Sequence, residues 1–349
     1  MGALFFFQTI QFSNTFLCRT NISNYKAVSD FVEARFISPV GIRADHLGRV
    51  AHGETAYSTL VFWTDLHNAL HYILYHEVAR EMSITPRQLT ALVDFLEVTT
   101  RYLAFPNGRV RHLLTQTRDW LQEQLASNDT VWPLHIETYL DTLKRFDFMS
   151  HFSEELQQSH PVPFSACGNV VVDEDDGLRA IYPRTDNIPE RHFPCSLWTL
   201  FHSLTVGEYL AHPAHRPPVN RTALVVTREF IVSFLGCRGC SGHFGNMSRH
   251  LREELPHANS SVLWLWRAHN RVNARLKETA SDVAVLAKRQ FPTLQECFTC
   301  YRAMPKEAYF KNATRYEPYY EEGAVLHFLV AFYHPQRMIT DQRWPTPDQ

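Results

Sequence analysis

The residues best suited to do chemistry lie in one short stretch, FLGCRGCSGHF, at positions 234 to 244. Its two cysteines, Cys237 and Cys240, are three positions apart, a spacing found in redox-active disulfides, structural disulfides and halves of zinc sites. At a helix start this spacing brings both sulfurs into one turn, where unpaired backbone N–H groups favour a thiolate. Arg238 adds a positive charge between them. The stretch is therefore a candidate thiol redox centre.

A second Cys-x-x-Cys pair, Cys297 and Cys300, keeps a four-thiolate zinc site open as an alternative. Zinc-binding pairs are commonly about 15 to 20 residues apart, whereas 56 residues separate Cys240 from Cys297. A thioredoxin-type pair would follow a strand in an α/β fold, and the surroundings of Cys237 have a helical pattern instead. A plain structural disulfide is the other alternative, common in secreted proteins.

Polar aromatic side chains recur at helical spacing in three places and help to choose among these alternatives. The sets are Trp198 and His202; Cys240, His243 and Phe244; and Trp266, His269, Asn270 and Asn273. Residues three or four apart lie on one face of a helix. Burying imidazoles and carboxamides without partners is costly. The three sets therefore predict a planar polar ligand, and a flavin fits.

Helices must position these residues. Apolar residues recur at three- and four-residue steps from Val61 to Val78, and Thr85 with Pro86 supplies the cap and first-turn proline of the next helix. Further helices are expected near 109–126, 195–211, 221–235, 238–254, 262–276 and 317–332. Between about 160 and 194, prolines and an acidic run predict a connector. There is no strand–helix alternation and no glycine-rich dinucleotide motif, so the fold class is all-α.

The composition indicates a globular protein and excludes some partners. The chain has 349 residues, is 45% apolar, and carries 34 basic and 36 acidic residues for a formal net charge of -2. No basic cluster is suited to nucleic acid or an anionic membrane. No stretch reaches the 18 or more apolar residues of a membrane span. We expect neither nucleic acid as a partner nor a membrane-spanning segment.

Cysteines and glycosylation motifs favour an oxidising compartment. Seven cysteines are compatible with three disulfides and one further thiol, and six Asn-x-Ser/Thr motifs begin at Asn21, Asn128, Asn220, Asn246, Asn259 and Asn312. The first ten residues lack a basic leading segment and a small-residue cleavage site, so they read poorly as a secretory signal. We expect the secretory pathway (ER or Golgi) or the extracellular space, with the signal peptide not visible.

Four blocks of the sequence, in this order, resemble the flavin-binding Erv-type domain of the quiescin sulfhydryl oxidases: RHFPCSLWTLFHSLTV, FLGCRGCSGHFGNM, VLWLWRAHNRVNARL and FPTLQECFTC. The segment VFWTDLHNALHYILYHEV resembles the helix-rich region that precedes this domain in the family. The resemblance implies an Erv-type FAD-binding helical bundle packed against a degenerate, helix-rich pseudo-Erv domain. The expected divisions are an N-terminal segment at 1–50, the helix-rich region at 51–160, the connector at 161–194, the Erv-type domain at 195–335 and a tail at 336–349.

The resemblance also implies the site residues. Those carried over for FAD are Arg191, Trp198, His202, Gly239, His243, Trp266, His269, Asn270, Val272, Asn273, Lys288 and Phe291. Phe291 stands where the family usually has Trp. Structural disulfides are implied for Cys297 with Cys300 and for Cys167 with Cys195, with no metal ion.

A flavin-linked thiol oxidase activity is the implied function. Cys237 would receive the incoming thiolate, Cys240 would pass two electrons to FAD, and O2 would become hydrogen peroxide. The implied thiol substrates are small dithiols, a thioredoxin-like shuttle or reduced proteins. The family carries an upstream thioredoxin domain, but Cys18 is the only cysteine before Cys167. We therefore expect small dithiols to be oxidised faster than unfolded proteins. The alternatives are an impaired flavin-binding or interaction protein and a structural zinc protein with four cysteine ligands.

Overall fold

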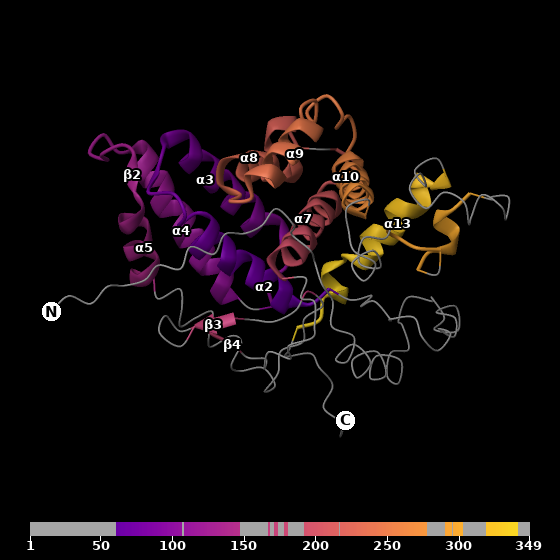
Figure 1. The fold of residues 1–349 in the computed structure, drawn as a ribbon, viewed down its shortest axis with the longest axis horizontal. Helices are drawn as coiled ribbons and strands as arrows, with labels where there is room; N and C mark the ends of the chain where they lie inside the picture. Colours follow the sequence, from indigo (N-terminus) through magenta and orange to yellow (C-terminus); the bar gives the residue numbers. More distant parts are fainter. Residues whose placement is uncertain are drawn as a thin grey trace, which may run out of the picture.

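In a computed structural model, the chain forms a mostly helical fold (Figure 1). The structure describes residues 61–106, 108–146, 167, 171–173, 178–180, 192–215, 217–277, 290–294, 296–302 and 319–340. The all-α fold class predicted from the sequence is confirmed. The predicted segment 1–50, Cys18 and most of the connector at 161–194 lie outside the described residues.

The helix-rich half begins with α2, which continues into a π-helical turn, η2. Its elements are α2 (Trp63–Tyr72), η2 (Ile73–Glu77), α3 (Pro86–Tyr102), α4 (Gly108–Ala126) and α5 (Ile136–Arg145). The predicted start of α3 is confirmed: the Thr85 hydroxyl accepts a hydrogen bond from the Gln88 N–H, and the Gln88 side chain accepts one from the Thr85 N–H. This reciprocal cap satisfies two donors at the helix end.

The second half contains the residues predicted to bind flavin. Its helices are α7 (His192–Ala211), α8 (Ala223–Phe234), α9 (Arg238–Met247), α10 (Ser260–Lys277) and α13 (Glu322–Phe332), with short 3-10 turns η3 (Val219–Arg221), η5 (Phe298–Cys300) and η7 (Pro335–Arg337). The predicted helix at 238–254 ends early, at Met247. The Ser248 hydroxyl bonds to the Phe244 carbonyl, and Arg228 of α8 donates to the Ser248 carbonyl, so the chain turns there.

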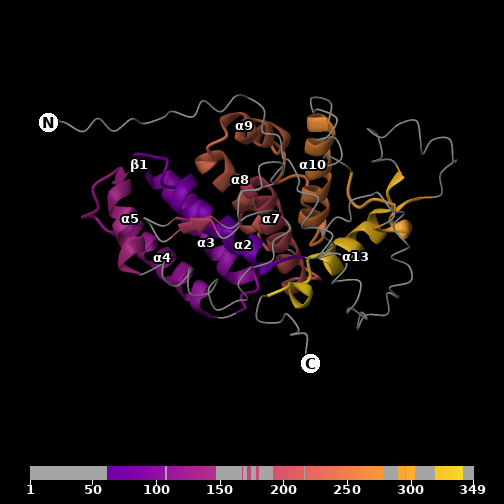
Figure 2. The ribbon, with the colours of Figure 1, turned by 60° about the horizontal axis from the view of Figure 1, so that its bottom comes forward.

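One core joins the two halves. Helix α2 packs against α7, and α3 packs against both α7 and α8; Figure 2 shows α2, α3, α7 and α8 side by side. The rings of Phe95 on α3 and Phe230 on α8 stack with centroids 4.3 Å apart, and both side chains are fully buried. At Gly207 of α7 an added Cβ would lie 2.1 Å from the Tyr102 carbonyl oxygen of α3. Glycine therefore lets these two helices approach closely.

Two small antiparallel strand pairs and one helix were not predicted. Strand β1 (Ser83–Ile84) pairs antiparallel with β2 (Leu134–His135), and β3 (Val171–Asp173) pairs antiparallel with β4 (Leu178–Ala180). Helix α5 was missed although Ile136, Tyr139 and Leu143 follow a helical pattern. Within the ranges described above, no helix is both long and apolar enough to cross a bilayer.

Candidate active site

The Cys237–Cys240 pair closes a disulfide where α8 gives way to α9. The two Cα atoms are 5.2 Å apart. Cys237 is the N-terminal cap of α9, and its sulfur accepts a hydrogen bond from the Cys240 N–H at 3.2 Å. The first N–H groups of a helix lack intrahelical acceptors, so one of them is directed at this sulfur. Cys240 is exposed and Cys237 half-buried, so exposure alone does not assign the entering thiol to Cys237.

Phe244 connects this disulfide to the interior. It lies one turn after Cys240, on the same side of α9, and its side chain is buried. Its ring contacts Trp198 of α7 at 6.4 Å and Trp264 of α10 at 6.0 Å between centroids, both edge to face. The inner face of α9 is thus held against aromatic rings from two further helices.

Three of the residues predicted to bind flavin lie together in a ring cluster. Trp198 and His269 stack with centroids 4.1 Å apart and an interplanar angle of 4°. His202 lies 5.5 Å from the His269 ring and 4.9 Å from the ring of Tyr333. The imidazoles of His202 and His269 share a 3.2 Å hydrogen bond between Nε2 and Nδ1. Tyr333 was not predicted to belong to the site.

One polar atom of this cluster, on His202, is buried without a hydrogen-bond partner. Its side chain is buried, and its Nδ1 atom has no hydrogen-bond partner. Burial lowers the pKa of His202 to about 3, so the ring is neutral at physiological pH. A buried polar atom without a partner is costly. A planar group with hydrogen-bonding heteroatoms would satisfy this nitrogen.

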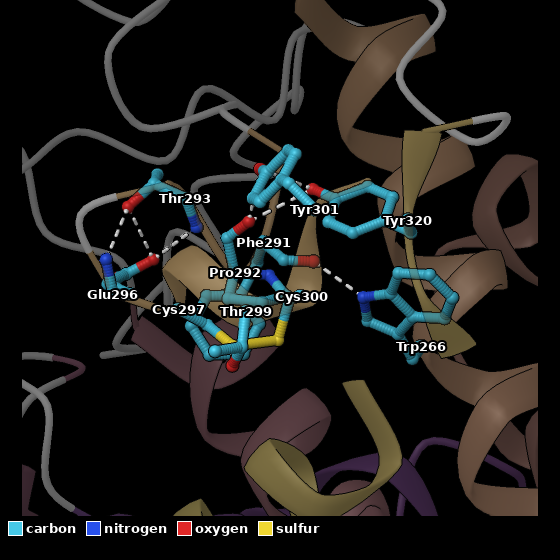
Figure 3. Close-up of a disulfide and its surroundings, with 10 residues drawn as sticks. All are labelled: Trp266, Phe291, Pro292, Thr293, Glu296, Cys297, Thr299, Cys300, Tyr301 and Tyr320. Carbon is cyan, nitrogen blue, oxygen red and sulfur yellow. Dashed lines mark hydrogen bonds between the residues drawn. A yellow bond between two sulfur atoms is a disulfide. The ribbon is translucent and has the colours of Figure 1, made fainter. Parts of the chain in front are cut away.

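A second group of predicted residues holds the chain segment around Phe291. The Asn270 carboxamide donates to the Phe291 carbonyl at 2.8 Å and accepts from the Phe291 N–H at 2.9 Å. The Trp266 indole N–H donates to the same carbonyl at 2.5 Å (Figure 3). The hydrogen-bonding groups of the Asn270 carboxamide are thus satisfied without a ligand. The inference from the sequence that a buried Asn270 needs a ligand is therefore wrong.

The Cys297–Cys300 disulfide lies a few residues after Phe291 on the same chain segment (Figure 3). Cys300 is fully buried, beside Tyr320 in a smaller core formed with α10 and α13. The hydroxyls of Tyr301 and Tyr320 donate to the Pro292 carbonyl at 2.6 and 3.0 Å. Both Cys-x-x-Cys pairs are therefore closed as disulfides, and sulfur in this form is not a zinc thiolate. Among the described residues, no three His, Cys, Asp or Glu side chains form a metal-binding group.

The third disulfide joins Cys167 to Cys195 in the first turn of α7, with Cα atoms 5.4 Å apart. The Cys167 N–H also donates to the Asp65 carboxylate of α2 at 3.3 Å. This disulfide therefore fixes the start of α7 beside the helix-rich half.

The remaining predicted cofactor residues are spread over α9 and α10. Gly239 and His243 are exposed on α9, and Val272 and Asn273 are half-buried on α10. Arg191 and Lys288 lie outside the described residues. The structure therefore brings together Trp198, His202 and His269, and separately Trp266, Asn270 and Phe291.

The helix-rich half contributes a carboxylate that the sequence analysis missed. Glu77, at the end of η2, is 4% exposed and accepts a 2.5 Å hydrogen bond from the Gly236 N–H, next to Cys237. Burial raises the pKa of Glu77, and this hydrogen bond together with Arg80 and Arg238 acts in the opposite direction. In the sequence, the signal for this role was a charged residue within an apolar helical stripe, between Leu74 and Val78.

The site residues fit FAD on the structure's own features. The unpartnered His202 nitrogen, the aromatic rings around it and the disulfide that Phe244 links to this cluster suit a flat redox cofactor that exchanges electrons with thiols. Trp198, His202 and His269 are the residues that would hold its ring system. Together, the fold and the site define a helical Erv-type flavoprotein with a Cys-x-x-Cys disulfide.

Comparison with known proteins agrees with this class. Residues 195–292 match the Erv1 / Alr family, and residues 58–150 match the family described as flavin adenine dinucleotide (FAD)-dependent sulfhydryl oxidase. Sulfhydryl oxidase 1 of Rattus norvegicus is 31% identical over 290 residues, which are 82% of this chain and 34% of the relative. Sulfhydryl oxidase 2 of Homo sapiens is 29% identical over 280 residues, 78% of this chain and 34% of the relative.

A solved structure is similar over most of the chain. The sulfhydryl oxidase fragment of human QSOX1 is 27% identical, with a TM-score of 0.59, and the match covers 80% of this chain and 99% of the fragment. The chain belongs to the quiescin sulfhydryl oxidase family, as the four sequence blocks predicted. FAD is the cofactor of this family's matched domains. The chain spans about a third of the length of the curated relatives that it matches.

Proposed function

We propose that this chain is a flavin-linked thiol oxidase that converts two thiols to a disulfide and O2 to hydrogen peroxide. The observation that carries the proposal is the Cys237–Cys240 disulfide at the start of α9, connected through Phe244 to Trp198, whose half-buried ring stacks on that of His269. The sulfhydryl oxidase relatives support the same reaction.

The first half of the reaction is thiol–disulfide exchange. A substrate thiolate attacks the Cys237 sulfur, the Cys237–Cys240 bond breaks, and Cys240 leaves as a thiolate. A second substrate thiolate then attacks the substrate sulfur of the mixed disulfide, which forms the substrate disulfide and releases Cys237. The substrate loses two electrons and two protons, and the enzyme disulfide becomes a dithiol. The Cys240 N–H at the start of α9 is directed at the Cys237 sulfur, so it stabilises the released Cys237 thiolate.

Trp198, His202 and His269 would hold the ring system of FAD, which when bound would supply the two-electron chemistry that links the dithiol to O2 and yields hydrogen peroxide. The contact between Phe244 and Trp198 packs α9 on the ring cluster, in which the His202 side chain is buried. His202 stays neutral there because burial lowers its pKa to about 3.

We propose the secretory pathway or the extracellular space as the location, with small dithiols or reduced proteins as substrates. Three disulfides are typical of oxidising compartments. The glycosylation motifs at Asn128, Asn220 and Asn246 are exposed. A mass decrease on treatment with peptide N-glycosidase, after expression in a secretory host, would support this location.

Oxygen consumption by the purified chain tests the function. With dithiothreitol, we expect a yellow protein that forms one hydrogen peroxide per O2, and no turnover after Cys240→Ser although the flavin stays bound. The matched control is the double variant Cys297→Ser/Cys300→Ser, which should keep turning over. Bound flavin without turnover would favour an impaired binding protein. A colourless chain that stays colourless with added FAD would overturn the proposal, and stoichiometric zinc would favour the four-cysteine zinc alternative.

A further inference from the structure

The loop that carries Cys237 is held by the helix-rich half. The Glu77 carboxylate accepts the Gly236 N–H at 2.5 Å, 159 residues apart in sequence. On the other side of the cysteine, Arg238 donates to Glu81 at 3.2 Å. Two carboxylates from one short segment thus hold the residues that flank Cys237.

The Arg80 side chain completes this contact. A Cβ added at Gly236 would lie 1.9 Å from the Arg80 guanidinium, so that group is packed against the Gly236 backbone. Arg80 also lies close enough to Glu77 to favour its charged form. Glu77 is 4% exposed, and burial raises its pKa against the effects of Arg80, Arg238 and the Gly236 hydrogen bond.

The π-helical turn places Glu77 at this position. The Val78 N–H bonds to the Ile73 carbonyl, five residues back, at 3.0 Å. The wider turn shifts the following residues around the helix axis relative to α2, and such turns are frequent at functional sites. A straight α-helix of the same sequence would direct Glu77 elsewhere.

We propose that Glu77 is a positioning residue for the redox-active disulfide: its reach to the Gly236 N–H fixes Cys237 as the cap of α9 and so sets how readily the Cys237–Cys240 bond is reduced. The inference rests on the proposed function, because it deals with the same disulfide. Holding Cys237 in place favours the closed disulfide, since the sulfurs are kept at bonding distance. Loosening the loop removes this advantage and makes reduction more favourable.

Three substitutions of Glu77 distinguish the length of its side chain from its charge as the cause of the effect. Glu77→Gln keeps the reach and the acceptor oxygen but loses the charge. Glu77→Asp keeps the charge but is one methylene shorter, and Glu77→Ala loses both. Glu97→Gln is the matched control: Glu97 is a carboxylate of the same half that pairs with Arg101 and Arg118, away from the disulfide.

The measurement is the equilibrium between the full chain and glutathione redox buffers under anaerobic conditions. Free thiols are alkylated, and the peptide containing Cys237 and Cys240 is quantified by mass spectrometry. We expect the equilibrium constant for reduction to rise about fivefold for Asp and Ala, the effect of losing one ordinary hydrogen bond. The Gln variant and the Glu97→Gln control should stay within about twofold of the wild type.

A rise in Gln but not in Asp would assign the effect to charge and overturn the proposal, as would no rise in any variant. Thermal unfolding of each variant identifies a chain that has not folded, and the Asp and Gln variants decide the question if Ala does not fold. This equilibrium needs no oxidase turnover. A chain that consumes no oxygen would therefore refute the proposed function while leaving the positioning role measurable.

Discussion

The indole of Trp198 lies parallel to the imidazole of His269, with centroids 4.1 Å apart and planes within 4°. The two residues come from α7 and α10, 71 positions apart in sequence. The stack joins two separate helices through one aromatic pair, in which each ring limits the other's orientation and leaves only its outer face open to a flat ligand. The ring cluster is therefore where cofactor binding should be most sensitive to substitution.

Replacing Trp198 by Ala should weaken FAD binding about fivefold or more, because an aromatic stack contributes about 1 kcal/mol beyond its buried area. The flavin absorbance retained after dialysis measures this. Trp120→Ala is the control, since Trp120 lies on α4 of the helix-rich half and is likewise a partly buried Trp packed against the core. Equal flavin loss from both variants would attribute the effect to general destabilisation.

The two structural disulfides should differ in their effect on stability. Cys297 and Cys300 are separated by 3 positions, Cys167 and Cys195 by 28. Because the longer loop has more entropy to lose, its removal should cost about 4 kcal/mol against about 2 for the shorter one. Calorimetry of the Cys297→Ala/Cys300→Ala and Cys167→Ala/Cys195→Ala variants measures the difference. The opposite order would mean that packing around the buried Cys300 outweighs loop entropy.

The close approach of α3 and α7 should make Gly207 intolerant of a side chain. In Gly207→Ala, the new Cβ would meet the Tyr102 carbonyl at 2.1 Å, and backbone cannot yield as a flexible side chain would. We expect a loss of about 2 kcal/mol in the free energy of unfolding. Gly323→Ala in α13 is the control, because a Cβ there meets nothing within 4 Å. Urea unfolding of both variants measures this; equal stabilities would show that the two helices can separate slightly without cost.

Local signals in the sequence predicted the parts of the structure that neighbouring residues determine. Thr85 and Pro86 gave the start of α3, because a cap depends on residues within one turn. Trp198 and His202 do share one helix, and Trp266 and His269 another, although Trp266 bonds to the Phe291 segment whereas His269 joins Trp198. That Trp198 stacks on His269 did not follow from spacing, since it depends on how α7 packs against α10.

Contacts between distant segments account for what the sequence could not give. The Asn270 carboxamide looked in need of a ligand because its partner, the Phe291 backbone, is 21 residues away. Glu77 looked like an ordinary polar position of a helix, because neither the π-helical turn nor the Gly236 contact leaves a pattern in sequence. Strands β1 and β2 have only two residues each, too few for any periodicity.

Glu208 should make the stability of the fold depend on pH. This buried residue of α7 accepts the Ala223 N–H at the start of α8 at 2.7 Å, and its side chain also bonds to Ser261 of α10. Burial raises the pKa of Glu208 from 4.5 to about 7, against the opposing effect of these two hydrogen bonds. The carboxyl group thus stays protonated in the folded chain at pH values where the unfolded chain has lost the proton.

Because the folded state binds the extra proton, the free energy of unfolding should fall as the pH rises from about 4.5 to about 7, by up to about 1.4 kcal/mol per pH unit. Above pH 7 this contribution is constant. Glu208→Gln keeps an acceptor for the Ala223 N–H and cannot ionise, so its stability relative to wild type should increase over the same range, by about 3 kcal/mol in total.

Urea unfolding at pH 5, 6, 7 and 8 measures this difference, in which other titrating groups cancel. Glu253→Gln, at an exposed carboxylate of the turn after α9, is the control and should follow the wild-type curve. Parallel curves for wild type and Glu208→Gln would show that Glu208 is already ionised in the folded chain at pH 5, so that its hydrogen bonds outweigh burial.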